Sequence, residues 1–120
     1  MTSTTPAETL AAAVAALDAP GGPERQLLRD GVRAGLAELA RAVPGKSVEV
    51  RVPPFGAVQC VDGPRHTRGT PPNLVECDPV TFLELAAGRT SFAVAVADGR
   101  VTASGARADL GDCLPLDLFR

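Results

Sequence analysis

The sequence predicts an α+β fold in one domain of 120 residues. Apolar residues recur at helical spacing in the first third of the chain, and strand-like alternation begins at Ser47. Predicted helices and strands are not strictly interleaved afterwards, which favours an antiparallel or mixed sheet over a doubly wound parallel one. We expect a single domain over residues 1–120, with an N-terminal helix and linker over 1–22 and the core over 23–120.

Two helices are predicted before the first strand. Thr5, Pro6 and Glu8 form a capping box with a first-turn proline, so a helix is expected over 6–18. A second, longer helix is expected to open at Pro23. Its apolar stripe consists of Leu28, Val32, Leu36, Leu39 and Val43. Pro44 and Gly45 then end the helix.

Four or five strands are expected in the remainder of the chain. Residues 47–52 alternate between valine and polar residues, and 57–62 form a second strand candidate. Residues 65–68 are a possible returning hairpin partner, while 74–76 and 100–104 are short strand candidates.

Short helices are expected between and after these last strands. Asp78 and Pro79 form a cap for a helix that Gly88 ends, and 91–97 predicts a further short helix. Residues 108–114 are expected to form one or two helical turns before Pro115.

Composition excludes several classes of protein. Twelve basic against 14 acidic residues give a net charge of -2, which argues against a nucleic-acid partner. No apolar run approaches the roughly 20 residues that span a bilayer, so no stable membrane insertion is expected. The first residues lack the features of a signal peptide, and three cysteines without a CxxC pair are typical of reduced thiols, so we expect a cytoplasmic protein.

The expected core is built from small side chains. Aromatic residues make up 3% of the chain, with four phenylalanines and no tryptophan or tyrosine. Such a core buries less apolar area per residue than usual.

Polar side chains gather in the predicted hairpin. His66, the only histidine, lies near Arg51, Arg65 and Arg68 in the sequence. These residues are either a site for an anion or polar headgroup or a solvated face of the hairpin.

No catalytic residue, metal site or cofactor is predicted. A zinc site would need His66 together with Cys60, Cys77 and Cys113, and no paired ligand spacing supports it. Scattered thiols are more often small core residues. A thiol or metal enzyme would require Cys60, Cys77 and His66 to converge in the fold.

A resemblance to a known family rests on motifs in the second half. The runs at 78–89 and 91–105 contain Gly88-Arg89 and Gly99-Arg100 at a spacing that resembles sterol carrier protein domains. Upstream, residues 51–59 and the HTRGTPPN stretch at 66–73 are similar to the bacterial sterol carrier orthologues. The matching stretches together cover residues 24–116.

This resemblance implies a roughly five-stranded, mainly antiparallel sheet backed by helices, with an apolar tunnel between them. It also implies apolar ligand contacts, at Phe82, Leu85, Phe92, Val96, Leu114, Leu116 and Phe119. Arg51, His66 and Arg68 are candidates for orienting a polar group at the mouth.

The resemblance therefore implies a non-catalytic carrier for a lipid or other apolar small molecule. Similar domains occur at the C-terminus of mycothiol-dependent maleylpyruvate isomerases, whose catalytic metal lies in a separate helical domain with several histidines. One histidine in this chain argues against that reaction. The alternative is an accessory module of a separately encoded enzyme, with the polar hairpin as its protein-contact surface.

Overall fold

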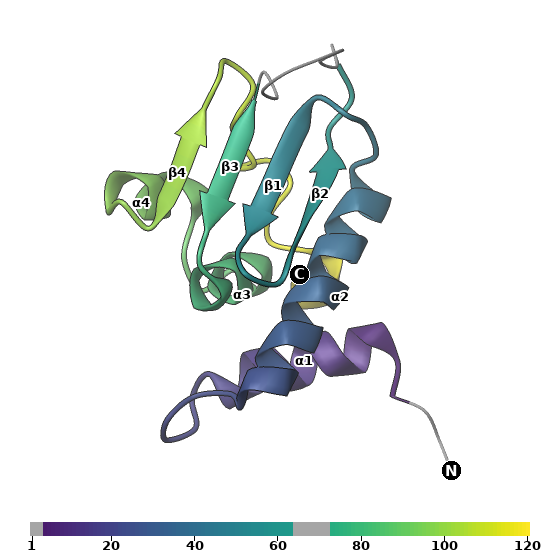
Figure 1. Cartoon of the computed structure of the whole chain (residues 1–120), viewed down its shortest axis with the longest axis vertical. Helices are drawn as coiled ribbons and strands as arrows, with labels where there is room; N and C mark the ends of the chain where they lie inside the picture. The colour runs from purple at the N-terminus through teal and green to yellow at the C-terminus, as the bar shows by residue number, and fades with distance from the viewer. Residues whose placement is uncertain (1–3, 64–72) are drawn as a thin grey trace.

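A mixed four-stranded sheet forms the centre of the fold (Figure 1). The structure is a computed structural model that describes residues 4–63 and 73–120. The strands are β1 (Val48–Val52), β2 (Gly56–Cys60), β3 (Leu74–Cys77) and β4 (Val101–Ser104), in the spatial order β2-β1-β3-β4.

Two of the three strand pairings are antiparallel, as expected, and the central one is parallel. β1 pairs antiparallel with β2, and β3 pairs antiparallel with β4, whereas β1 and β3 run parallel with Glu49 opposite Leu74. The α+β class is confirmed, but the described part of the chain holds four strands instead of about five. The predicted fifth strand at 65–68 lies outside the described residues.

The two faces of the sheet differ because side chains alternate along each strand. Val48, Val50 and Val52 of β1 point to the helix side and are buried. Glu49 and Arg51 point to the opposite face and are half-buried. The core therefore lies on one side of the sheet, between the strands and the helices.

Helices α1 (Pro6–Ala16) and α2 (Arg25–Ala42) begin at side-chain caps. The predicted capping box of α1 is confirmed: Thr5 Oγ1 accepts from the Glu8 backbone, and Glu8 accepts from the Thr5 backbone. Helix α2 begins two residues later than predicted, because Glu24 is the N-cap and its carboxylate accepts from the Leu27 backbone at 3.2 Å.

Two glycines of α2 allow neighbouring helices to approach closely, α1 at Gly31 and α3 (Pro79–Ala87) at Gly35. A Cβ atom at Gly31 would lie 2.4 Å from Ala13 Cβ of α1. One at Gly35 would lie 2.8 Å from the Phe82 ring. Both distances are shorter than packed carbon atoms allow, so only glycine fits these two positions.

Helix α3 lies at the lower end of the sheet in Figure 1, and α4 (Phe92–Ala97) lies beside the edge strand β4. Asp78 caps α3 by accepting from the Thr81 backbone at 3.1 Å, which confirms the predicted start. Gly88 ends α3 in the left-handed conformation at φ 75°, which glycine adopts without strain.

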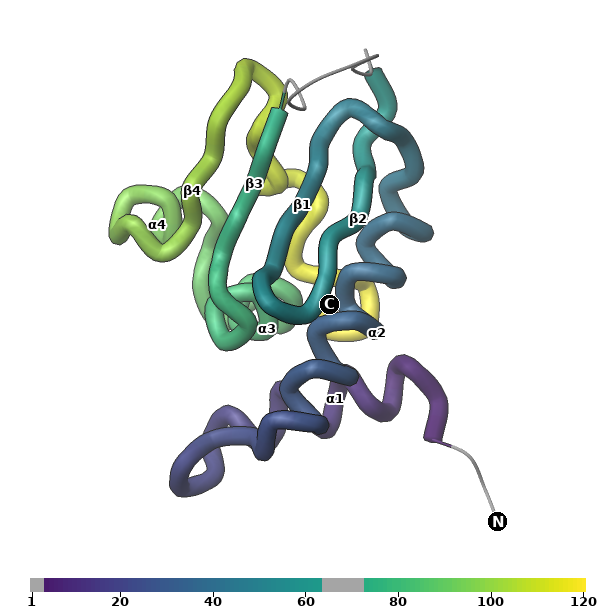
Figure 2. Tube along the Cα trace, viewed as in Figure 1, coloured from purple at the N-terminus to yellow at the C-terminus, as the bar shows by residue number. Residues whose placement is uncertain are grey.

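The C-terminal segment passes behind the sheet on the side of α3 and ends in a 3₁₀ turn, η1 (Asp117–Phe119) (Figure 2). Of the one or two helical turns expected at 108–114, the structure has a single hydrogen-bonded turn, in which the Cys113 backbone donates to the Leu110 carbonyl at 2.9 Å. Asp109 accepts from the Gly111 backbone at 2.8 Å and diverts the chain into isolated turns. None of the helices described is long and apolar enough to cross a membrane.

Candidate functional site

Three of the predicted apolar contacts are packed inside the core. Phe82 and Leu85 of α3 and Leu116 of the C-terminal segment are each at most 2% exposed. The Phe82 ring fills the space above Gly35, and the Leu116 backbone donates to the Ala86 carbonyl at 3.0 Å. These three side chains fill the space between the helices and the sheet at their positions.

Two other predicted contacts meet at a small hollow. Phe92 at the start of α4 and half-buried Leu114 line a pocket of about 260 Å³ beside Gly88 and Pro115. Val96 faces solvent at 38% exposure, and Phe119 is half-buried in η1. The seven predicted apolar residues thus lie in several environments, and their role as ligand contacts stays a prediction.

The predicted polar residues are not gathered at this hollow. Arg51 lies on the face of the sheet opposite the helices, where its Nε donates to the Glu49 carboxylate. Glu76 of β3 lies opposite Arg51 in the β1–β3 pairing. His66 and Arg68 lie outside the described residues.

Cys60 and Cys77 are buried and lie toward opposite ends of the sheet, whereas half-buried Cys113 lies near Cys60. Cys60 is opposite Val48 at one end of β1, and Cys77 follows Glu76, which is opposite Arg51 near the other end. Four residues of strand separate them by about 13 Å along the strand direction. Burial, with the nearby Cys113, raises the pKa of Cys60 to about 11, and burial, with Asp78 and Glu76, raises the pKa of Cys77 to about 12. Both are therefore protonated at neutral pH and are poor nucleophiles.

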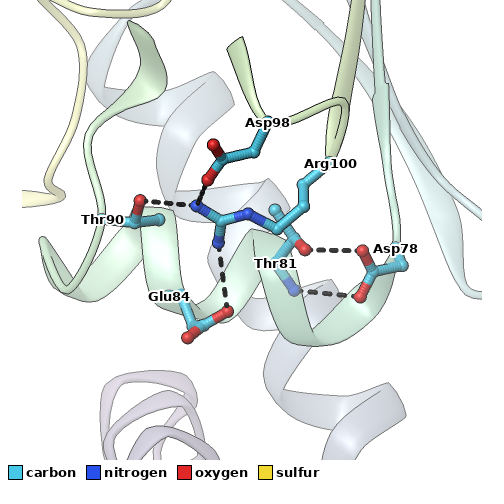
Figure 3. A network of polar contacts seen from close by, with 6 residues as sticks. All are labelled: Asp78, Thr81, Glu84, Thr90, Asp98 and Arg100. Carbon is cyan, nitrogen blue, oxygen red and sulfur yellow. Dashed lines mark hydrogen bonds and ion pairs between the residues drawn. The ribbon is translucent and has the colours of Figure 1, made fainter. Parts of the chain in front are cut away.

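The arginines of the two Gly-Arg motifs tie helices together. Arg89 donates through Nη1 and Nη2 to both carboxylate oxygens of Asp18, at 2.8 and 3.0 Å, and so fastens the end of α1 to α3. Arg100 Nη2 lies 3.0 Å from both Thr90 and Asp98, and Nη1 lies 3.7 Å from Glu84 (Figure 3). Arg100 therefore fixes the start of β4 against α3 and the end of α4.

A larger apolar groove lies between α1, α2 and η1. We call it the α1–α2 groove, and its volume is about 420 Å³. Its apolar lining consists of Pro6, Ala7, Leu10, Ala34, Ala37 and Leu118. Glu38 and Arg41 are its two charged lining residues. Arg41 Nε donates to Glu38 at 2.9 Å, and its Nη2 donates to the second oxygen of the same carboxylate.

Sequence reasoning missed this groove. It followed the leucine and valine stripe of α2 and not the neighbouring stripe of small residues. Gly31 and Gly35 are buried there, and half-buried Ala34, three residues after Gly31, borders the groove. Small residues three and four apart on a long helix are the signal that a second helix can approach closely.

The family model for the bacterial SCP ortholog matches residues 24–116. No curated protein matches the chain significantly. Helix α1 and Leu118 lie outside the matched residues, whereas the four strands, α2, α3 and α4 lie inside them. Since the match covers most of the sequence, the chain belongs to the family of bacterial SCP (sterol carrier protein) orthologs.

Proposed function

We propose that the protein is a non-catalytic binding or carrier domain for a lipid or other apolar small molecule, and that the α1–α2 groove holds the ligand. Family membership supports a carrier over an accessory module. Three free thiols are in keeping with action in the reducing cytoplasm.

The observation that carries the proposal is the size and lining of the groove. Small-molecule sites usually enclose about 300–1,000 Å³ and are lined mainly by apolar side chains with a few polar groups. The α1–α2 groove, at about 420 Å³, meets this description. The hollow at Phe92 and Leu114, at about 260 Å³, is below that range.

Burial of hydrocarbon in the groove supplies the binding free energy. Each methylene removed from water contributes about 0.8 kcal/mol. Affinity should therefore rise steadily with the length of the ligand chain until the groove is filled. Phe92 and Leu114 are proposed as secondary contacts, because a ligand in their hollow would occupy less volume.

The test is native mass spectrometry of the protein after bacterial expression, together with titration of a neutral fluorescent apolar probe such as Nile red. We expect co-purified lipid and probe binding at micromolar concentration. Ala37→Trp places an indole in the groove from an exposed position of α2, so it should reduce probe affinity at least tenfold.

The matched control is Ala11→Trp, at an exposed position of α1 that does not line the groove. It should leave probe binding within twofold of wild type. Absence of both co-purified lipid and probe binding would rule out the proposed function. Equal loss in the two tryptophan variants would instead remove the groove as the binding site.

A further inference from the structure

The charged part of the α1–α2 groove is an ion pair one helical turn apart on α2. Two N–H groups on one edge of the Arg41 guanidinium are occupied by the two oxygens of Glu38. The Arg41 side chain is 69% exposed and that of Glu38 is 30% exposed. An arginine carries five N–H donors, so three remain for a ligand or water.

Neighbouring carboxylates offset the positive charge of Arg41. Hydrogen bonding and attraction from Glu38, with a further contribution from Asp117 of η1, raise the pKa of Arg41. Arg120 Nε in turn lies 3.5 Å from Asp117. These four described residues carry two positive and two negative charges, so their sum is zero.

A cluster with no net charge offers an ionic head no net attraction to offset the hydration that the head loses on binding. A carboxylate approaching Arg41 meets Glu38, which already occupies the bidentate edge, and also meets the field of Asp117. A cationic head would be opposed by Arg41 itself. A neutral hydroxyl or ester pays no such repulsion, accepts from the remaining Arg41 N–H groups, and a hydroxyl also donates to Glu38.

Resting on the proposed function, we infer that the α1–α2 groove selects amphiphiles with a neutral hydrogen-bonding head over those with a carboxylate. The hydrocarbon lies along the alanine, leucine and proline side chains. The head lies at the Glu38–Arg41 pair. Ligands of this class include long-chain alcohols and monoacylglycerols.

The experiment compares two ligands with the same chain and different heads. Dodecan-1-ol and dodecanoate, each below the concentration at which it forms aggregates, compete with Nile red for the full-length protein at pH 7. We expect the alcohol to bind at least fivefold more tightly. One unit charge at about 4 Å in water changes affinity by about fivefold, which sets this threshold.

Glu38→Gln sharpens the test. It removes one negative charge with little change of shape, which frees the Arg41 guanidinium for an anion. Affinity for dodecanoate should rise at least fivefold relative to affinity for the alcohol, so the preference of wild type for the alcohol should be lost. Asp30→Asn makes the same change in net charge about two turns away on α2 and should alter neither affinity.

Each outcome decides one statement. If both ligands bind wild type equally, or dodecanoate binds more tightly, and Ala37→Trp blocks them, the headgroup inference is overturned and the proposed function stands. If Asp30→Asn matches Glu38→Gln, the effect is general charge and the inference is again overturned. If Nile red binds and neither ligand displaces it, the headgroup inference is overturned. If Nile red does not bind and no lipid co-purifies, the proposed function itself fails.

Discussion

The two halves of α1 meet α2 in opposite ways. Ala13 in the C-terminal half is fully buried and lies directly against Gly31, so the helices touch without a gap. Pro6 and Ala7 in the N-terminal half are exposed and border the α1–α2 groove. Because α1 crosses α2 instead of running along it, contact is tight at the crossing and opens away from it (Figure 1). One helix pair thus has a close contact at one end and borders an apolar groove at the other.

The largest expected effect on stability comes from removing a buried side chain next to the close helix contacts of α2. Phe82→Ala removes a ring that is 1% exposed and packs over Gly35. Deleting a buried phenylalanine costs about 3–5 kcal/mol, because apolar burial is lost and a cavity remains. Urea denaturation should show a loss of unfolding free energy in this range. A loss below about 1 kcal/mol would mean that the core closes over the gap, contrary to rigid packing there.

Ligand binding to Phe82→Ala also tests whether the ligand occupies the α1–α2 groove or the core. Phe82 is among the contacts that the family resemblance implies, and it does not line the α1–α2 groove. If the groove is the site, Nile red affinity of folded Phe82→Ala should equal that of wild type. Tighter binding would show that the emptied core accepts ligand instead.

An intermediate effect is expected at the helix crossing. Gly31→Ala would normally stabilise a helix by up to about 1 kcal/mol. Here the new methyl meets Ala13 Cβ, and overpacking costs about 1–3 kcal/mol, so the net change should be destabilising. Thermal unfolding followed by circular dichroism measures it.

The double variant Gly31→Ala with Ala13→Gly provides the check on this crossing. It moves the methyl group from α1 to α2 and so removes the clash at the crossing. The double variant should therefore regain most of the unfolding free energy lost in Gly31→Ala, less the cost of the new glycine in α1. A Gly31→Ala protein more stable than wild type would contradict the close approach.

The smallest effect is expected at the exposed Asp18–Arg89 pair. Hydrogen bonding and attraction from Arg89 hold the pKa of Asp18 below its ordinary value. A carboxyl with a lowered folded-state pKa stabilises the protein above its unfolded pKa. That contribution is lost as pH falls through the folded value.

Asp18→Asn should therefore be slightly less stable than wild type at neutral pH. The two proteins should converge well below the ordinary Asp pKa of about 3.9. Unfolding free energies measured across this pH range test it. A difference that persists in acid would show that Asp18 acts through something other than its charge.

Local signals explain why most elements were predictable. Thr5 and Glu8, Asp78 and Pro79, and the alternating valines of β1 act through neighbouring residues, and each placed its element within a residue or two. At 108–114 the chain makes a single turn and no continuous helix, because the Asp109 side chain accepts from the Gly111 backbone and competes with a helix.

The site was less predictable because it depends on packing between distant segments. Helix α4 reads FAVAVA, which is apolar on every side, so periodicity alone did not show that Phe92 and Ala95 are buried while Val94 and Val96 are exposed. The groove needs α1, the far half of α2 and Leu118 to meet, and no local pattern in one segment specifies that meeting.

The position of the groove walls has a consequence for specificity. Pro6, Ala7 and Leu10 on one side and Leu118 on the other lie outside the residues that match the family, while Ala34, Ala37, Glu38 and Arg41 lie inside them. Under the proposed function, the residues matched to the family would supply the floor of the site and the segments on either side of them its walls. Exchanging the exposed wall residues Pro6, Ala7 and Leu118 would then change the preferred ligand and leave the sheet and the buried side chains of α1 in place.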